Sequence, residues 1–352
     1  MAIKKISIEE FIGLAKTNRV LDVRSSSEFN HGHFPGAYNL ALFTDEERKI
    51  VGTAYKQQGR ERAIKIGLDF YGVKMRRMVE EVEKLNSKNP SDVILIHCWR
   101  GGMRSEAIAW LLDLYGFKVC LLNGGYKKFR NFVLDTFSEP LQFKIISGST
   151  GSGKTNLLDE LSKLNESTID LENIAHHKGS AFGAIDQLPQ PSQEMFENIL
   201  ALKLRNNGNG FFWIEDESQR IGLVSIPPEL WKQMQQSPVY FIDIPFEARL
   251  LKIEMEYGKF EKVKLTDATC RIQKRLGGLE TKMTIKFIEE GNLLDGFRIL
   301  LRYYDKCYRK SLTNRNKYNP VRNTVSCEDV DARRNAGLLL RSLNTEPENI
   351  NS

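Results

Sequence analysis

The segment FKIISGSTGSGKT (residues 143–155) constrains the fold of this chain more than any other stretch. A short run rich in β-branched residues leads into a glycine-rich loop, whose last three positions are Gly153, Lys154 and Thr155. The loop is followed by apolar residues with the spacing of a helix, namely Leu157, Leu158, Leu161 and Leu164. A strand, a loop of the form G-x4-G-K-T and a helix, in this order, build a phosphate-binding loop. The second half of the chain is therefore predicted to be an α/β domain that binds phosphate groups.

This P-loop brings together several groups that can hold the phosphates of a nucleotide or of another diphosphate. Its backbone N–H groups turn toward a phosphate, Lys154 neutralises negative charge, and the Thr155 hydroxyl is a candidate ligand of a Mg²⁺ ion. In NGNGFFWIEDES (207–218), Glu215 and Asp216 follow a buried strand, where a carboxylate that holds metal-bound water belongs. The predicted phosphate site consists of Gly148, Ser149, Thr150, Gly151, Ser152, Gly153, Lys154, Thr155, Glu215, Asp216 and Arg275.

Some of these assignments leave alternatives open. Thr155 and Glu215 are the candidate Mg²⁺ ligands, but the spacing does not decide between Glu215 and Asp216. Arg275 could close over phosphates, although a solvated helix face explains its position equally well. The segment RILLRYYDKCYRK (298–310) fits contact with RNA bases and phosphates, and a core helix with a basic rim explains it somewhat better.

A second constrained turn surrounds Cys98, in HCWRGGMRS (97–105). The run before it, SDVILI (91–96), predicts a buried strand, and SEAIAWLLDLYG (105–116) predicts a helix that ends at a glycine. Free N–H groups at the start of such a helix point into the turn, bind an anion and favour the nucleophilic thiolate. We predict three catalytic residues, Cys98, Arg100 and Arg104. The rest of the anion-binding loop would be Trp99, Gly101, Gly102, Met103 and Ser105.

A buried structural thiol is the common alternative for a free cysteine. Cys120, in the apolar run KVCLL (118–122), fits that description. Two arginines and two glycines around an inert Cys98 would have no purpose, so we favour catalysis there. The spacing from Cys98 to Arg104 is Cys-x5-Arg, which is typical of cysteine-dependent phosphatases and fits a tetrahedral oxyanion. The loop alone leaves two chemistries open: phosphatase, or chalcogen transfer from a phosphate-bearing donor.

The length of the chain, 352 residues, indicates two domains. Strand candidates at 19–23, 93–97 and 118–122, separated by amphipathic segments, predict a first α/β domain with a mainly parallel sheet. We expect domains at 1–135 and 136–342, followed by a polar tail at 343–352. Five cysteines without a CxxC pair argue against disulfides and zinc, and no segment suits a membrane span or a signal peptide. The expected location is the cytoplasm, with no membrane partner.

Two motifs of the first half carry a resemblance to a known family. The segment LDVRSSSEFNHGHFPGAYNL (21–40) resembles the opening motif of rhodanese-type sulfurtransferases, and NGGYKKFR (123–130) resembles the motif that closes their domain. The Cys98 loop occupies the position of their active-site loop and is one residue longer than is usual. The resemblance implies a rhodanese-like parallel-sheet domain in front of a P-loop NTPase-like α/β domain.

The two domains together resemble the tRNA 2-selenouridine synthase family. The similar segments, besides the two loops, are FTDEERKIVGTAYKQQGRERAIKIG (43–67), HHKGSAFG (176–183), QPSQEMFEN (190–198), IEDESQRIG (214–222) and IQKRLGG (272–278). The resemblance implies a transferase that acts on the anticodon wobble uridine of tRNA. It would replace the sulfur of 5-methylaminomethyl-2-thiouridine by selenium from selenophosphate, through an S-geranyl intermediate made from geranyl diphosphate.

The same resemblance implies roles for individual residues. Cys98 would carry selenium as S-selanylcysteine, and Arg100 and Arg104 would stabilise the released phosphate. The P-loop would hold either geranyl diphosphate or a nucleotide, a choice that the sequence leaves open. The expected enzyme has no tightly bound cofactor, is a monomer, and has selenophosphate synthetase as a candidate partner that supplies the donor.

Two other classes of function remain as rivals. One is a nucleotide-dependent kinase or ATPase that carries a Cys-x5-Arg phosphatase-like or sulfurtransferase module. It would hydrolyse nucleoside triphosphates steadily without tRNA. The other is an RNA-binding regulator that uses both loops only as ligand sensors.

Overall fold

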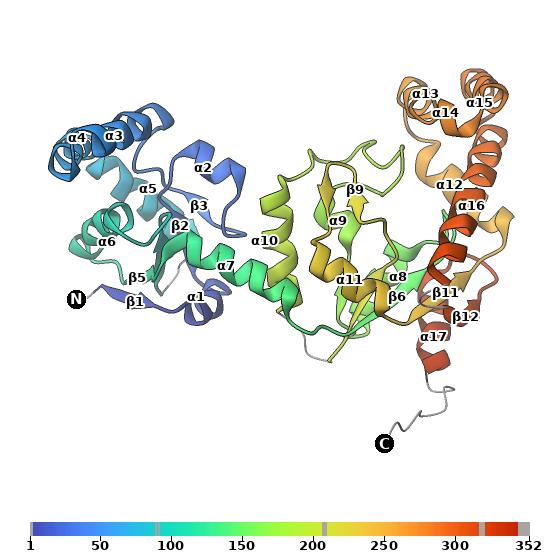
Figure 1. Cartoon of the computed structure of the whole chain (residues 1–352), viewed down its shortest axis with the longest axis horizontal. Helices are drawn as coiled ribbons and strands as arrows, with labels where there is room; N and C mark the ends of the chain where they lie inside the picture. Colours follow the sequence, from blue (N-terminus) through green and yellow to red (C-terminus); the bar gives the residue numbers. More distant parts are fainter. Residues whose placement is uncertain (1–2, 89, 91, 206–209, 317–320, 344–352) are drawn as a thin grey trace. The chain divides into compact units, whose positions relative to one another are not determined.

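The computed structural model describes residues 3–88, 90, 92–205, 210–316 and 321–343. Contacts divide the chain into two compact units (Figure 1). Unit 1 consists of residues 1–136 and 197–201, and unit 2 consists of residues 137–196 and 202–352. The predicted polar tail lies outside the described residues except for Leu343, which ends the last helix.

Unit 1 is built on a five-stranded parallel sheet with the strand order β1-β5-β4-β2-β3. The strands are β1 (Lys4–Ile6), β2 (Arg19–Asp22), β3 (Tyr38–Asn39), β4 (Ile94–His97) and β5 (Val119–Leu122). The helices are α1 (Ile8–Ala15), α2 (Ser26–His31), α3 (Asp45–Gln57), α4 (Arg60–Gly72), α5 (Met75–Lys88), α6 (Met103–Tyr115) and α7 (Gly125–Ser138). All of β4 is buried, as expected for the middle of a parallel sheet with covered faces.

The strand and helix predicted around Cys98 are confirmed as β4 and α6. Gly116 ends α6 in the left-handed conformation, with φ +112°, and its N–H donates to the carbonyls of Leu112 and Asp113. The three strand candidates of this domain are confirmed as β2, β4 and β5. Cys98 therefore follows a central strand directly, at the carboxyl edge of the sheet.

Unit 2 has a second five-stranded parallel sheet, with the order β12-β11-β6-β8-β7. Its strands are β6 (Phe143–Ser147), β7 (Thr168–Ile169), β8 (Phe212–Glu215), β11 (Val239–Asp243) and β12 (Val321–Ser326). A small antiparallel pair joins β9 (Arg220–Ile221) to β10 (Val224–Ser225). The predicted α/β class thus holds for both halves of the chain.

The helices of unit 2 include one, α8, that starts at the P-loop lysine. They are α8 (Lys154–Lys163), α9 (Leu171–Ala175), α10 (Gln193–Leu204), α11 (Pro228–Gln236), α12 (Phe246–Tyr257), α13 (Lys262–Arg271), α14 (Gln273–Leu276), α15 (Gly278–Glu290), α16 (Leu293–Asn316) and α17 (Ala332–Leu343). In the part of the chain that the structure describes, no helix is long and apolar enough to cross a membrane.

Candidate active sites

The Cys98 loop has a tightly fixed backbone. Gly101 has φ +67°, and a Cβ atom there would lie 2.6 Å from the carbonyl oxygen of Leu122. Gly125 has φ +60°, and its Cβ would lie 2.4 Å from the carbonyl oxygen of Cys98. The Tyr126 N–H donates a hydrogen bond to that same carbonyl at 2.8 Å. Only glycine fits where the loop meets the segment after β5, which explains why both motifs are glycine-rich.

The thiol of Cys98 lies inside this loop, with 4% of the residue exposed. Its Sγ atom is 3.2 Å from the hydroxyl of Ser105, in the first turn of α6. The same hydroxyl donates a hydrogen bond to the carbonyl of Gly102 at 2.9 Å. Because the one proton of this hydroxyl goes to Gly102, Ser105 accepts from the Cys98 thiol, and the donors left for a thiolate are the free N–H groups at the start of α6.

The two arginines of the loop have different surroundings. Arg104 donates to both carboxylate oxygens of Glu28, at 2.7 and 3.3 Å. Burial alone would raise the pKa of Glu28, but the hydrogen bond and charge of Arg104 hold it below its usual value. Arg48 approaches the same carboxylate, with 3.8 Å between Nε and Oε2. Arg100 is exposed and forms no ion pair within the described residues, so it is the arginine available to an incoming anion.

In unit 2, residues 148–155 form the predicted loop between β6 and α8. Gly151 and Gly153 have φ values of +79° and +76°, which L side chains rarely adopt. The ammonium group of Lys154 donates to the carbonyl of Gly148 at 3.2 Å. The loop therefore runs directly into the start of α8, where free backbone N–H groups and the helix dipole favour a phosphate.

Residues from two later helices hold the P-loop in place. Arg249 of α12 is buried, and it pairs with both carboxylate oxygens of Asp305 of α16 at 2.8 Å each. Its guanidinium also donates to the carbonyl of Thr150 at 3.0 Å. The hydroxyl of Tyr308, on the same helix as Asp305, accepts a hydrogen bond from the Gly148 N–H at 3.0 Å. The aromatic and basic segment that contains Tyr308 is thus a structural part of this site.

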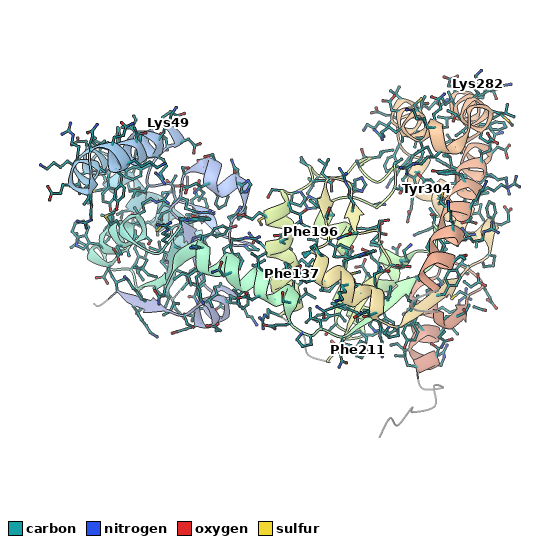
Figure 2. All side chains as sticks on the ribbon, viewed as in Figure 1. Lys49, Phe137, Phe196, Phe211, Lys282 and Tyr304 are labelled. Carbon is teal, nitrogen blue, oxygen red and sulfur yellow. The ribbon has the colours of Figure 1, made fainter. Side chains whose placement is uncertain are left out.

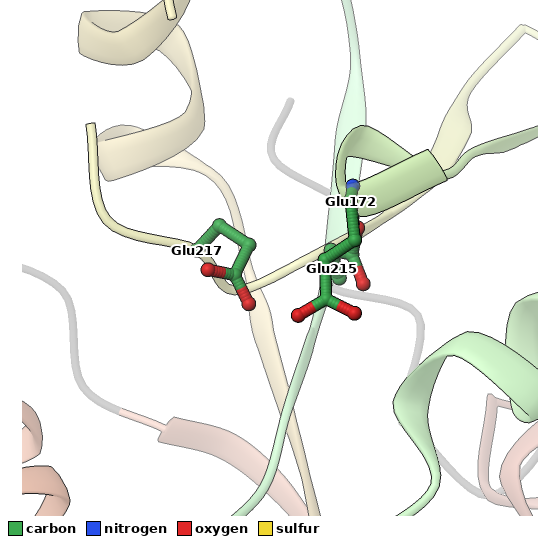
Figure 3. A group of neighbouring side chains, drawn as sticks. All are labelled: Glu172, Glu215 and Glu217. Atoms are coloured by element: carbon green, nitrogen blue, oxygen red, sulfur yellow. Dashed lines mark hydrogen bonds between the residues drawn. The ribbon is translucent and has the colours of Figure 1, made fainter. Parts of the chain in front are cut away.

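Three carboxylates gather beside the loop: Glu172 of α9, Glu215 at the end of β8, and Glu217 (Figure 3). One oxygen from each lies within 4.8 Å of the others. Burial raises all three pKa values, and repulsion by Glu172 raises those of the other two further, that of Glu215 well above its usual range and that of Glu217 to about 8. Glu215 Oε2 is buried without a hydrogen-bond partner. The charge of Lys154 acts on Glu172 and Glu217 but does not offset the effect of burial on either pKa.

The hydroxyl of Thr155 lies next to this group and donates to Glu172 at 3.1 Å. A hydroxyl and several carboxylate oxygens are the donors that Mg²⁺ prefers, so the residues present fit such an ion. Asp216, the other acid considered, accepts a hydrogen bond from the Ser147 hydroxyl at 2.5 Å. Of the two predicted acids, Glu215 therefore belongs to the carboxylate group, whereas Asp216 contacts Ser147.

The P-loop opens into a cavity of about 880 Å³. One wall is polar and includes Lys154, Thr155, Glu172, Glu217 and Lys178. Apolar and aromatic residues also line the cavity, namely Phe182, Ile253, Tyr257, Phe297, Leu300, Leu301 and Tyr304. Tyr304, labelled in Figure 2, comes from α16. The cavity can therefore hold a ligand with an anionic end and an apolar body.

One predicted site residue lies elsewhere. Arg275 in α14 is exposed and interacts with Tyr303, and it is not among the described residues that line the cavity. Conversely, Glu172, Glu217 and Lys178 line the cavity without having been predicted. Glu217 stands in the same acidic run as Glu215, so the run itself was the available signal. Nothing in the sequence marks Glu172 as part of this group, because it follows a different strand, β7, and lies in α9.

Comparison with known proteins agrees with both halves of the structure. A family model described as a rhodanese-like domain matches residues 7–132, and one described as the tRNA 2-selenouridine synthase AAA domain matches residues 141–332. The fold and the two loops thus define a rhodanese-like domain joined to a P-loop domain.

The relatives narrow this class further. The tRNA 2-selenouridine synthase of Aeromonas salmonicida (strain A449) is 35% identical over 335 residues, which cover 84% of this chain and 88% of the relative. The protein of the same name from Nitrosomonas europaea is 40% identical over 248 residues, 68% of this chain and 63% of the relative. The chain belongs to the tRNA 2-selenouridine synthase family. A crystal structure of the N-terminal domain of a candidate ATP/GTP-binding protein from Clostridium difficile 630 is 40% identical over 38% of this chain and 99% of that chain, with a TM-score of 0.34.

Proposed function

We propose that this protein is a tRNA-modifying enzyme that replaces sulfur by selenium at the wobble 2-thiouridine. The substrates are 5-methylaminomethyl-2-thiouridine in tRNA, geranyl diphosphate and selenophosphate. The reaction has two half-reactions, one at each loop. In the first, the 2-thio sulfur displaces diphosphate from geranyl diphosphate and becomes S-geranylated. In the second, selenium replaces the geranylated sulfur.

The cavity at the P-loop carries this proposal. Lys154 and the backbone of residues 148–155 suit a diphosphate, and the apolar side chains that line the same cavity suit a hydrocarbon chain. A nucleotide would bring a polar ribose into the same cavity, where Phe297, Leu300 and Leu301 offer only apolar contacts. These apolar side chains therefore support geranyl diphosphate over a nucleotide as the ligand of this loop.

The same site would hold a Mg²⁺ ion. Thr155 and Glu215 are the ligands proposed first, and Glu172 and Glu217 lie close enough to join them. When bound, the ion would neutralise charge on the leaving diphosphate. Lys154 holds the diphosphate from the loop side. Burial opposes its charge, but Glu217 and its neighbours raise the pKa of Lys154, so it stays cationic.

The second half-reaction belongs to the Cys98 loop. S-geranyl-2-thiouridine, selenophosphate and water give 2-selenouridine, geranyl thiol and phosphate, and no net electrons are transferred. We assign the Cys98 thiolate as the nucleophile that attacks the phosphorus of selenophosphate: a sulfur–phosphorus bond forms, the phosphorus–selenium bond breaks and selenide leaves to replace the geranylated sulfur. Water then hydrolyses the sulfur–phosphorus bond to phosphate and the free thiolate, and Arg100, with Arg104, holds the phosphate. A sulfur–selenium bond is two electrons more oxidised than a thiolate and a selenide. An S-selanyl form of Cys98 would therefore also need a thiol–disulfide couple to balance its formation and discharge.

The test gives each of two variants and one control variant two substrates in separate reactions, 2-thiouridine tRNA and tRNA that is already geranylated. Lys154→Ala loses one charge-assisted contact to diphosphate, which costs about 2–3 kcal/mol, or roughly a hundredfold in the rate of geranyl transfer. It should still insert selenium when given tRNA that is already geranylated. Cys98→Ala should accumulate S-geranylated tRNA and form no 2-selenouridine, whereas Cys120→Ser, which alters the half-buried thiol of β5, should behave as wild type. Nucleoside analysis by mass spectrometry reports all four outcomes.

Two results would contradict the proposal. If Lys154→Ala geranylates tRNA at the wild-type rate, the P-loop binds something other than the prenyl donor. If Cys98→Ala still forms 2-selenouridine, the assignment of the nucleophile is wrong. Steady hydrolysis of nucleoside triphosphates without tRNA would instead favour a kinase or ATPase with an attached phosphatase-like or sulfurtransferase module.

A further inference from the structure

The helix pair α3–α4 of unit 1 carries charge that the fold does not use. Residues 48–66 hold six basic side chains and one acidic side chain, Glu61, which gives a formal charge of +5. The whole chain has a formal charge of +6. The net charge of this segment is thus nearly as large as that of the whole chain. The segment spans most of α3, the turn and the first half of α4.

Five of these cations project into solvent: Lys49, Lys56, Arg60, Arg62 and Lys65. Within the described residues, none of the five forms an ion pair or a hydrogen bond through its side chain. Two other exposed lysines of unit 1 do form pairs, Lys4 with Glu10 at 2.6 Å and Lys5 with Glu106 at 2.7 Å. We call the five side chains the basic surface, and Lys49 is labelled on this helix pair in Figure 2.

Two of the five acids of the same helix pair have partners outside the basic surface. Glu47 pairs with Lys74, and Asp45 accepts a hydrogen bond from the Ser27 hydroxyl at 2.5 Å. Both stand in the first turn of α3, where negative charge also stabilises the start of the helix. Counted over both helices, six basic side chains face five acidic ones, but three of the acids stand in the first turn of α3, so the positive charge is concentrated in residues 48–66.

Apolar side chains lie exposed among these cations. Ile50 is 49% exposed, Tyr55 is 51% exposed and Leu68 is 58% exposed. An aromatic ring between cations suits a nucleic acid, because the ring can stack on a base or a sugar while the cations contact phosphates. A surface whose only role is solvation gains nothing from exposing these side chains.

The basic surface starts beside the Cys98 loop. Arg48 approaches Glu28, with 3.8 Å between Nε and Oε2, and Glu28 holds Arg104 of the loop at 2.7 Å. From there α3 rises about 1.5 Å per residue, so Lys49 and Lys56 lie on the order of 10 Å apart along one side of the helix. A polyanion bound along the helix pair would therefore continue to the thiol.

We infer that the basic surface binds the phosphate backbone of the substrate tRNA and so presents the wobble base to Cys98. The inference rests on the proposed function for the identity of the RNA. The apolar side chains of the P-loop cavity and the carboxylates beside the loop play no part in it. The surface acts through charge, so it changes affinity for tRNA and leaves the chemical step unchanged.

The experiment compares two triple variants with equal charge change. The surface triple is Lys49→Gln, Lys56→Gln and Lys65→Gln. The control triple is Lys16→Gln, Lys84→Gln and Lys118→Gln, three exposed lysines that precede β2, β4 and β5, at the opposite edge of the sheet from Cys98. Binding of 2-thiouridine tRNA is measured by fluorescence anisotropy over a series of salt concentrations.

The surface triple should lose at least about tenfold in affinity, and its slope of log affinity against log salt should flatten by about two to three. The control triple should stay within about twofold of wild type. A third variant that replaces the same three surface lysines by arginine should bind like wild type. At saturating tRNA, the surface triple should turn over at the wild-type rate, because KM rises and kcat does not.

The outcomes separate this inference from the proposed function. If wild type binds tRNA and the surface triple binds it as tightly as the control triple does, the inference is wrong and the proposed function stands. The inference is also wrong if the surface triple lowers kcat and leaves KM unchanged. If wild type itself has no affinity for tRNA, the proposed function fails, and the inference falls with it.

Discussion

The two anion sites of this protein use carboxylates in opposite ways. In unit 1, Asp22 pairs with Arg24 at 2.6 Å, with both side chains buried, and Glu28 pairs with Arg104. Burial alone would raise both pKa values, but His97 and Arg24 lower that of Asp22, and Arg104 lowers that of Glu28. In unit 2, Glu172, Glu215 and Glu217 crowd together, and their pKa values rise.

This difference indicates what each site requires before it can bind an anion. Around Cys98 the acids are already neutralised by arginines, so Arg100 and the helix N-terminus can attract an anion without a metal. Beside Lys154 the crowded acids disfavour their own charged forms, so they can ionise together next to a diphosphate only if a further cation joins them. A divalent cation would supply that charge. The comparison therefore predicts that one half-reaction depends on metal and the other does not.

The largest expected effect tests the paired acids of unit 1. Asp22→Ala leaves the guanidinium of Arg24 buried and uncompensated, which should lower the free energy of unfolding by about 3–5 kcal/mol. The measurement is urea denaturation followed by circular dichroism. The matched control is Glu10→Ala, which removes the exposed pair with Lys4 and should cost less than about 1 kcal/mol. Equal losses in the two variants would mean that Asp22 is not the buried partner on which this site depends.

The next effect is metal removal, and it compares the two half-reactions directly. EDTA should slow geranyl transfer by about a hundredfold, since the diphosphate then leaves without a neutralising ion. Selenium insertion into geranylated tRNA should change by less than about twofold, because the arginines of the Cys98 loop need no metal. Mg²⁺ added in excess should restore the first activity. If EDTA slowed both half-reactions equally, the two sites would not differ in their need for a metal ion, and the comparison would be wrong.

The sequence predicted those parts of each site that lie on one continuous segment. Residues 148–155 and the Cys98 loop are local motifs, in which glycines, a helix start and a reactive side chain occur within a few positions. The parallel α/β fold followed from the alternation of strands and amphipathic helices, which is also local. These predictions needed no knowledge of tertiary contacts.

The sequence did not predict residues that reach a site from another element. Glu172 meets Glu215 because β7 and β8 pair in parallel, so their carboxyl ends lie side by side. Arg48 reaches Glu28 from α3, and Tyr308 reaches the Gly148 N–H from α16. Periodicity assigns such residues to a helix, but it does not say which loop the helix packs against. The pairing of the strands and the packing of α16 supply that information.

The smallest effect concerns pH and the crowded acids of unit 2. The pKa of Glu217 rises to about 8, because burial and then Glu172 disfavour its charged form. An acid with a raised pKa in the folded state binds more protons folded than unfolded between its two pKa values. The stability that it contributes is fully present below the unfolded pKa, near 4.5, and is lost as pH rises to about 8. Metal-free protein should therefore melt at a lower temperature at pH 8 than at pH 5.5.

Glu217→Gln tests the origin of that slope. The amide keeps the shape of the side chain and cannot ionise, so the fall in stability between pH 5.5 and 8 should shrink by on the order of 1–2 kcal/mol. The effect is smaller than the full shift of Glu217 would give, because the three acids share their protons and Glu172 and Glu215 still titrate. Saturating Mg²⁺ should flatten the wild-type profile in the same way, since the ion stabilises the charged carboxylates. Calorimetry at several pH values, with EDTA or with Mg²⁺, measures both effects. An unchanged profile in Glu217→Gln would mean that the acids of unit 2 are compensated as those of unit 1 are, and the proposed dependence of geranyl transfer on metal would lose its physical basis.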